Sequence, residues 1–258
     1  MVKMAKNQRQ EKLLLILAKK KTVKVSELIE SVKFSPMTIH RDLEWLEQNG
    51  IVKRSHGDVT LIRNDAGQPS FHERISEFSH EKYIIGKRAA KLIKPGSVVF
   101  FDAGTTPLAV TDHIPDDLKF TAITTGILTA AALCGKPLIN VISIGGSIHH
   151  SSYSSVNRMA VDSIQNFHAD LAFISTKSVI LPEGTYEPNL PLIEIKQAIV
   201  HSSDKIALLA DNSKFETKSM CKAVPLEMID TIISDSGLAS RYLQQIEQSG
   251  KEMIIAEE

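Results

Sequence analysis

A turn between a predicted strand and a predicted helix carries the residues best suited to chemistry. The run FFDAGTTPLAV begins as an apolar strand, continues through Asp102 to Thr106, and then becomes helix-like. Gly104 lets the backbone approach a ligand closely, and the free N–H groups and positive dipole end of a new helix favour an anion such as phosphate. The hydroxyls of Thr105 and Thr106 add donors. The turn therefore predicts an anion site, and a plain strand–helix turn capped by threonine is the alternative.

Polar residues also follow other apolar runs, and a lysine lies in the helical run LIEIKQAIV. These further candidates for ligand contact are Thr124, Thr125, Gly145, Gly146, Lys196, Asp211 and Lys214. Because ligands of open α/β sheets bind beyond the carboxyl ends of the strands, we expect these loops to converge. A lone lysine is most often solvated, but Lys214 comes just after an apolar strand, a place that favours a pocket.

From about Lys82 the chain alternates strand-like and helix-like runs. The short apolar runs that predict strands are SVVFFDAG, FTAIT, LINVISIGG, ADLAFIST, KIALLADNS and MIDTIISD. The helical runs between them are EKYIIGKRAAKLI, TTPLAVTDHI, ILTAAALC and PLIEIKQAIVHSS. This alternation is typical of βαβ units and predicts a mostly parallel sheet. We expect a linker with a leading helix over 63–80 and an α/β domain over 81–258.

The first part of the chain has a different pattern. Two helical runs, NQRQEKLLLILAKK and VSELIESV, precede a third that begins after Ser35. Ser26 and Ser35 suit N-cap positions, and Pro36 suits a first helical position because its missing N–H costs nothing there. Two strand-like runs, IV and VTLI, follow around a polar, glycine-containing turn. Three short helices and a hairpin predict a winged helix-turn-helix domain over 1–62.

The third helix separates apolar from polar side chains. On a helix of 100° per residue, Leu43 and Leu46 lie within about 40° of Ile39, so this face packs on the other helices. The exposed N-terminal end is the part of a helix-turn-helix that enters the major groove. The predicted DNA contacts are Ser35, Met37, Thr38, His40 and Arg41 in this helix, and Lys53, Arg54 and His56 in the wing.

These side chains and the charge distribution suit nucleic acid. Arg41 can donate two hydrogen bonds to a guanine, and the wing cations are placed for phosphates or the minor groove. Residues 1–62 contain 12 Lys and Arg against 7 Asp and Glu, and the rest of the chain contains 18 against 23. A basic segment joined to an acidic one favours a polyanionic partner for the first. A three-helix protein-binding module with a solvated arginine is the alternative.

The run SPMTIHRDLEWLEQNGIVKRSHG resembles the helix-turn-helix and wing of the DeoR family of bacterial transcriptional regulators. The recognition helix of that family usually reads Thr-Ile-Arg-Arg-Asp-Leu, so His40 departs from the commoner arginine. Asp58 stands where the family wing usually has a second glycine. The resemblance implies a repressor of sugar or nucleoside catabolism genes that binds double-stranded operator DNA as a dimer or tetramer.

The second domain is similar to the sensor domain of the same family. The matching segments are Asp102 to Thr106, Gly145-Gly146, Gly184-Thr185, Lys196, and Asp211 to Phe215. The resemblance implies a fold like that of ribose-5-phosphate isomerase and a phosphorylated sugar as effector. It implies that Gly104, Thr105, Thr106 and Lys214 grip the effector, with Asp102 near a sugar hydroxyl. Thr124-Thr125-Gly126 departs from the usual Thr-Asn-Ser of the family. Release of DNA by the effector is the arrangement expected of a catabolic repressor.

Two other functions draw on the same residue types. An isomerase would need a carboxylate base and a lysine beside a sugar phosphate, which this chain offers in Asp102, Glu183, Glu187 and Lys196. An isomerase does not need a winged helix, however. A metal-sensing repressor would use His149-His150, but adjacent residues of a strand point to opposite faces, and no cysteine or carboxylate cluster accompanies them. We therefore expect no enzyme activity, no metal and no cofactor.

Three further patterns bear on the cellular location. Cys134 and Cys221 lie far apart without partner motifs and are expected to be reduced thiols. No run of about 18 apolar residues predicts a transmembrane helix. The N-terminal run MVKMAKNQRQ lacks the apolar core of a signal peptide. We expect a cytoplasmic protein.

Overall fold

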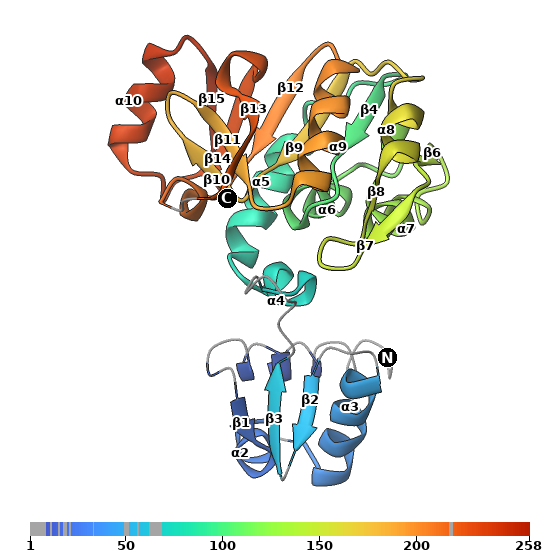
Figure 1. The fold of residues 1–258 in the computed structure, drawn as a ribbon, viewed down its shortest axis with the longest axis vertical. Helices are drawn as coiled ribbons and strands as arrows, with labels where there is room; N and C mark the ends of the chain where they lie inside the picture. Colours follow the sequence, from blue (N-terminus) through green and yellow to red (C-terminus); the bar gives the residue numbers. More distant parts are fainter. Residues whose placement is uncertain are drawn as a thin grey trace. The chain divides into compact units, whose positions relative to one another are not determined.

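The computed structural model divides the chain into two compact units, Met1–Glu77 and Phe78–Glu258 (Figure 1). The structure describes residues 9–10, 12–14, 16–17, 20, 22–32, 34–48, 52–55, 57–61, 69–216 and 219–258. The predicted wing contact His56 lies outside the described residues, as does the part of the predicted linker over 63–68.

The first unit is a winged helix. The described residues between Arg9 and Lys20 are helical. The elements that follow are β1 (Thr22–Lys24), α2 (Val25–Ser31), α3 (Pro36–Gln48), β2 (Val52–Ser55) and β3 (Asp58–Leu61). The strands form an antiparallel sheet in the order β1-β3-β2. The predicted helices and hairpin are confirmed, whereas β1 was not predicted, because a three-residue strand is too short to show alternation.

Helix α2 begins differently from the prediction. It begins at Val25 after Lys24, and no side chain caps it, so the expectation that Ser26 is the N-cap is wrong. The N–H of Val25 instead donates to the carbonyl of Gly57 at 2.9 Å. The wing turn therefore supplies the acceptor for the first N–H group of this helix.

The apolar stripes of the three helices meet in one core with the small sheet. Its fully buried members include Leu13, Leu17, Leu28, Ile39, Leu43, Leu46 and Val59. Burying each such side chain contributes roughly 1.5–3 kcal/mol, which fixes the face that α3 turns inward. The opposite face of α3, predicted to meet DNA, is left in solvent.

The wing hairpin turns through two residues. Ser55 pairs with Asp58, which leaves only residues 56 and 57 as the connection. Gly57 has a φ of +86°, a conformation that two-residue hairpins require and that glycine adopts without strain. Asp58 also pairs with Lys24 of β1, so the added negative charge of this wing lies beside a cation in the strand register.

The second unit is built on a seven-stranded sheet in which every neighbouring pair is parallel. The strand order is β15-β14-β12-β9-β4-β5-β6. The strands are β4 (Val98–Phe101), β5 (Phe120–Thr124), β6 (Ile139–Ser143), β9 (Leu171–Ser175), β12 (Ile206–Leu209), β14 (Thr231–Asp235) and β15 (Glu252–Ala256). All six predicted strands lie in this sheet, which confirms the predicted α/β class, and β15 adds an edge.

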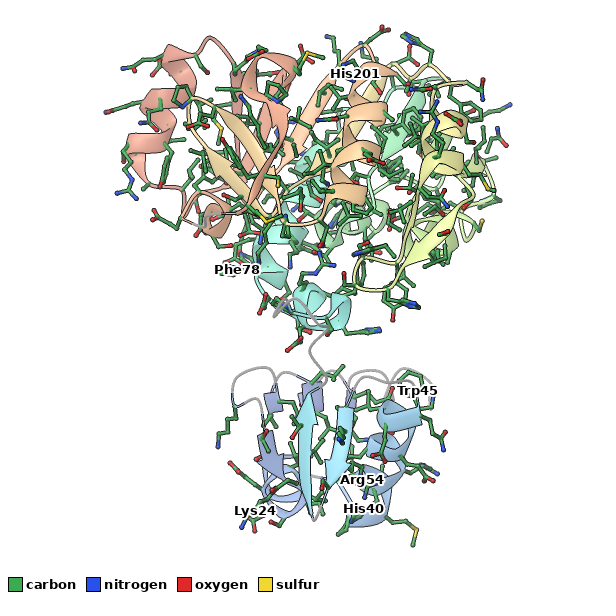
Figure 2. All side chains as sticks on the ribbon, viewed as in Figure 1. Lys24, His40, Trp45, Arg54, Phe78 and His201 are labelled. Carbon is green, nitrogen blue, oxygen red and sulfur yellow. The ribbon has the colours of Figure 1, made fainter. Side chains whose placement is uncertain are left out.

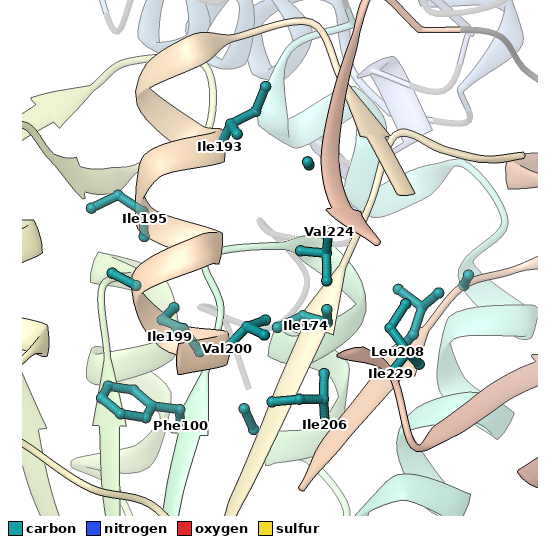
Figure 3. Close-up of a cluster of buried hydrophobic side chains, with 14 of the residues drawn as sticks. Phe100, Ile174, Ile193, Ile195, Ile199, Val200, Ile206, Leu208, Val224 and Ile229 are labelled. Carbon is teal, nitrogen blue, oxygen red and sulfur yellow. The ribbon is translucent and has the colours of Figure 1, made fainter. Parts of the chain in front are cut away.

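Helices cover both faces of the sheet. They are α5 (Ser79–Ala90), α6 (Thr105–Thr111), α7 (Ile127–Leu133), α8 (Arg158–Ile164), α9 (Leu190–His201) and α10 (Ser240–Gln248). Since side chains alternate along a strand, Phe101, Phe173 and Leu209 pack in one core with α5, α6 and α7. Phe100, Ile174 and Leu208 pack in the other core with α8, α9 and α10, and Figure 3 shows α9 lying over them. We call these the α5 face and the α9 face.

Smaller elements complete the chain. They are α4 (Phe71–Ser76), the hairpin of β7 (Ser147–His149) and β8 (Ser154–Val156), the antiparallel sheet of β10 (Ser178–Ile180), β11 (Gly184–Glu187) and β13 (Cys221–Pro225), and the short helices η1 (Asn212–Lys214) and η2 (Leu226–Met228). Helix α4 has a capping box in which Ser70 and Glu73 each bond the backbone of the other. Among the described residues, no helix is long and apolar enough to cross a membrane.

Candidate functional site

The N-terminal end of α3 is held open to solvent by a serine cap. The N–H of Thr38 donates to Ser35 Oγ at 3.3 Å, and the two hydroxyls are 2.8 Å apart. Ser35 is therefore the cap, and the hydroxyl of Thr38 already has one partner. Met37 is 83% exposed and Arg41 is also exposed, so both are free of the core, as the helical periodicity predicts.

The wing and α3 meet through a polar contact. Arg54 of β2 places Nη2 3.2 Å from His40 Nδ1, and its backbone N–H donates to Glu47 Oε1 at 2.9 Å. Figure 2 shows His40 and Arg54 next to each other on the first unit. Lys53, the preceding residue of β2, is exposed. The structure thus joins two of the predicted DNA contacts, one from each element.

A buried ion pair lies under the recognition helix, and the sequence reasoning missed it. Asp42 is fully buried and accepts bonds from both Arg9 Nε and Arg9 Nη2, the latter at 3.1 Å, and from Gln10 Nε2 at 3.3 Å. The hydrogen bond with Asp42 raises the pKa of Arg9. A signal was available, because Asp42 lies about 60° from Ile39 on the helix and so places a charge on the apolar face.

The second unit has a topological switch point between β4 and β9. From β4 the chain runs outward through β5 and β6, and it then returns to the other side of β4 and runs outward through β9, β12, β14 and β15. Open α/β sheets bind ligands beyond the carboxyl ends of the strands at such a switch point. The turn from Asp102 to Thr106 follows β4 and the segment Ser175–Lys177 ends β9, so both lie at this point of the sheet.

A buried charge cluster lies at this switch point. Lys196 of α9 forms ion pairs with Asp102 and, at 3.4 Å, with Glu187 of β11. Asp102 Oδ2 also accepts from the N–H of Ser175 at 3.2 Å and from its hydroxyl at 3.3 Å. Glu187 accepts from the N–H of Lys177 at 3.2 Å. Two carboxylates thus share one ammonium group.

Burial sets the protonation of this cluster. Burial raises the pKa of Glu187, and the nearby charge of Asp102 raises it further against the attraction of Lys196. Burial alone would lower the pKa of Lys196, but the two carboxylates outweigh it and the pKa is raised. Lys196 is therefore a cation in the folded chain, and Glu187 is the carboxyl group that takes up a proton most readily.

The predicted anion turn starts with a close approach of backbone to side chain. A Cβ at Gly104 would collide with Ser175 Oγ, so only glycine fits there. Gly104 is the N-cap of α6 and no side chain caps this helix, which excludes the alternative of a threonine-capped turn. Thr105 is partly exposed, whereas Thr106 is 3% exposed. Of the two hydroxyls, that of Thr105 is the more accessible to a ligand.

The loops after β5 and β6 are fixed by hydrogen bonds and close backbone contacts. Thr124 is fully buried, and its hydroxyl donates to the carbonyl of Phe101 at 2.7 Å and accepts from the N–H of Gly126 at 3.0 Å. Thr125 lies beneath the β7–β8 hairpin, since its carbonyl accepts from the N–H of Ser155 at 2.8 Å. Gly146 has a φ of +149°, and a Cβ there would lie 2.6 Å from the carbonyl oxygen of Val156. Gly145 next to it is exposed.

The loop after β12 belongs to the other face of the sheet. Asp211 is fully buried, and its Oδ1 accepts from the N–H of Ser213 at 3.1 Å, while its Oδ2 lies 3.4 Å from Lys214 Nζ. Lys214 Nζ also lies 5.9 Å from the ring centre of Phe78, which precedes α5 and has a left-handed backbone (φ 53°). Side chains alternate between the two faces of a strand. Asp211, two residues after Leu209, therefore lies on the α5 face, and Asp102, two residues after Phe100, lies on the α9 face.

The predicted effector residues thus form two groups at one edge of the sheet. Asp102 and Lys196 meet on the α9 face, and Asp102 also accepts hydrogen bonds from Ser175, which the sequence reasoning did not name. Asp211 and Lys214 meet on the α5 face. Because Asp211 follows a strand two places from β4, roughly 10 Å separates the two strand ends. The sequence predicted that these loops converge in one place, whereas the structure places the effector candidates in two groups on opposite faces of the sheet.

No group of three or more metal-ligating side chains occurs among the described residues. A cavity of about 540 Å³ lies elsewhere, at the amino ends of the strands, between residues such as Ser97, Asp170 and Lys205. It is remote from every predicted effector residue, since the opposite ends of the same strands carry those.

Two family models match the chain. The model of the DeoR-like helix-turn-helix domain matches residues 9–65, and that of the DeoR C terminal sensor domain matches residues 77–236. The transcriptional regulator GolR of Listeria innocua is 31% identical over 250 residues, which are 97% of this chain and 98% of GolR. The glycerol-3-phosphate regulon repressor of Escherichia coli is 27% identical over 233 residues, 90% of this chain and 92% of the repressor.

Solved structures are more distant. Ribose 5-phosphate isomerase A of Methanocaldococcus jannaschii has a TM-score of 0.41 and 15% identity, with 54% of this chain and 55% of that chain covered. The sorbitol operon regulator SorC of Klebsiella pneumoniae has a TM-score of 0.34 and 12% identity, with 80% and 89% covered. Likenesses of this size carry no argument about a ligand or a reaction.

The curated relatives and the family models decide between the functions that the sequence left open. The first unit matches a helix-turn-helix family, which favours DNA over a protein-binding module, and the relatives are named as regulators, not as isomerases. The chain belongs to the DeoR family of transcriptional regulators, and it is a DNA-binding regulator and not an enzyme.

Proposed function

We propose that this regulator represses genes of sugar or nucleoside catabolism, and that a phosphorylated sugar bound in the second unit controls its grip on DNA. The observation that supports the ligand site is the buried cluster of Asp102, Lys196 and Glu187 at the switch point of the sheet. Carboxylates accept and ammonium groups donate, so the cluster offers both partners that sugar hydroxyls need. A relative named for a glycerol-3-phosphate regulon supports a phosphorylated compound.

The phosphate is assigned to the turn that opens α6. Gly104 has no side chain to keep a ligand from the backbone, and Thr105 adds a partly exposed hydroxyl at an uncapped helix start. Lys214, in the loop after β12 two strands away, is the cation that we assign to the phosphate, and 21% of its side chain is exposed. Asp102 is assigned to the sugar hydroxyls, because it lies with Lys196 at the switch point of the sheet.

Operator DNA is assigned to the exposed end of α3 and to the wing. Met37 and Arg41 are exposed on α3, and on β2 Lys53 is exposed while Arg54 is partly exposed beside His40. Helix-turn-helix proteins usually read paired half-sites, so the protein acts as a dimer or tetramer. Its proposed site of action is the cytoplasm. For the effector to release DNA, it must bind the DNA-incompetent form more tightly than the competent one.

Thermal unfolding with a panel of sugar phosphates tests the effector. At about 100 times its Kd, a ligand specific to the folded state adds about 2.7 kcal/mol, which raises the Tm of a unit of this size by roughly 5–10 °C. A rise with one phosphorylated sugar, absent with its free sugar, is the expected result. No rise with any member, in a protein that still binds DNA, would contradict the proposal.

Two lysines that flank the same strand give the matched control. Lys214 follows β12 at the carboxyl edge, and Lys205 precedes it at the amino edge. Lys214→Ala should abolish the Tm rise and the release of DNA while leaving DNA affinity unchanged, and Lys205→Ala should leave all three unchanged. An intact response in Lys214→Ala would remove Lys214 from the site.

A further inference from the structure

Arg54 is held in place from two sides. Its backbone lies in the hairpin, paired with Val59, and its N–H donates to Glu47 of α3 at 2.9 Å. Its guanidinium then reaches His40, with Nη2 3.2 Å from Nδ1. The backbone bond and the side-chain contact both go to α3, so Arg54 connects the wing strand to the recognition helix at two points.

The chemistry of arginine fixes the proton on His40. A guanidinium can only donate hydrogen bonds, so His40 Nδ1 must accept. An imidazole that accepts at Nδ1 donates through the hydrogen on Nε2. His40 is exposed, so this Nε2–H group is available to a partner outside the chain. The remaining N–H groups of Arg54 lie beside it as further donors.

We propose that His40 and Arg54 act as one unit that reads a guanine in the major groove. The unit offers donors only, and guanine is the base whose major-groove edge offers two acceptors, N7 and O6. His40 touches the base, and Arg54 is a positioning residue that sets the tautomer and ring orientation of His40. This inference rests on the proposed placement of the α3 end in the groove.

The neighbours of His40 on α3 support a base contact over a phosphate contact. His40 lies one turn after Met37, which is 83% exposed, and next to Arg41, so it belongs to the same projecting end of the helix. An arginine in place of His40 could not accept from Arg54 and would bring two cations together. With histidine at this position, the chain therefore has a base preference that an arginine would not produce.

The test is selection of binding sites from a pool of randomised double-stranded DNA, with the full chain and its variants. His40→Ala and Arg54→Ala should both relax the preference for guanine at one and the same position, by about 5- to 150-fold against a mismatched base. Arg41→Ala should relax a different position. His40→Gln should restore the preference, because its amide can accept from Arg54 and still donate outward.

Each other outcome is decisive. If His40→Ala weakens binding equally for all sequences, the contact is to phosphate and the inference is wrong. If Arg54→Ala relaxes a position other than that of His40→Ala, the two residues do not act as a unit. If the unaltered chain enriches no sequence, both the inference and the proposed placement of α3 in the groove are overturned. Unchanged Tm values of the variants establish that they fold.

Discussion

The two units bury charge in different ways. In the first, one aspartate meets one arginine: Asp42 accepts twice from Arg9 and once from Gln10. In the second, two carboxylates meet one ammonium group, since Lys196 lies between Asp102 and Glu187. The first group is balanced in charge, and the second has a negative charge too many unless Glu187 holds a proton.

This difference separates a structural ion pair from a candidate binding site. A charge-balanced pair stabilises the contact between the helices it joins, because the charge of each partner is compensated by the other. An unbalanced group keeps acceptor capacity, a property common at functional sites. The buried charge of the winged helix joins α3 to the first helix, and the buried charge of the second unit belongs to the proposed effector site.

Removing the acid of the balanced pair should have the largest effect. Asp42→Ala leaves Arg9 buried without a counter-charge, which should cost about 3–5 kcal/mol and unfold the first unit before the second. Denaturant titration followed by DNA binding measures this. Glu44→Ala, an exposed acid of the same helix, is the control and should stay within about 0.5 kcal/mol. Equal losses of unfolding free energy in the two variants would show that the Arg9–Asp42 pair does not stabilise the first unit.

Removing the shared lysine should have a somewhat smaller effect. Lys196→Met leaves two buried carboxylates, which can reduce the loss by taking up protons, so we expect about 2–4 kcal/mol. The loss should be greater at pH 8 than at pH 5, since protonated carboxyls need no counter-charge. The free energy of unfolding of the second unit at both pH values measures it, with exposed Lys205→Met as control. A pH-independent loss would exclude the shared-proton description.

The smallest effect should come from Glu187→Gln. The pKa of Glu187 is raised, so the folded chain binds a proton that the unfolded chain releases, and stability falls as pH rises from the ordinary carboxyl value through the raised one. Glutamine stays neutral and should remove this slope, a change on the order of 1 kcal/mol. Unfolding free energies between pH 4 and 7 measure it. Glu183→Gln, an exposed glutamate of the same hairpin, should keep the slope.

Local patterns were enough to predict the elements and much of the core. The 3.6-residue period identified the buried face of α3 through Ile39, Leu43 and Leu46, and apolar runs identified six of the seven sheet strands. The strand Thr22–Lys24 escaped because its pairing partner, Asp58–Thr60, determines it more than its own composition does. The β10–β11–β13 sheet escaped for the same reason, since its strands are short and pair across distant segments.

The candidate site was predictable in its residues but not in its grouping. Asp102, Gly104 and Lys196 have the residue types that ligand sites use, and the structure brings Asp102 and Lys196 together over 94 positions of sequence. That Asp211 lies on the opposite face depends on the register between β12 and β9, which pairs Leu209 with Ser175. The register between two strands is set when the sheet assembles, so it cannot be predicted from the sequence of either strand alone.

The place of β4 in the sheet has a consequence for synthesis of the protein. β4 is the earliest strand of the sheet to leave the ribosome, yet its neighbour β9 follows about seventy residues later, and the ion-pair partner of Asp102 follows 94 residues later. Until Lys196 has emerged, Asp102 has no cation to enter the interior with, so the centre of the sheet closes late. The winged helix, complete in sequence by Leu61, is free to fold first. The newly made chain can thus complete its helix-turn-helix unit before the buried cluster of the second unit is assembled.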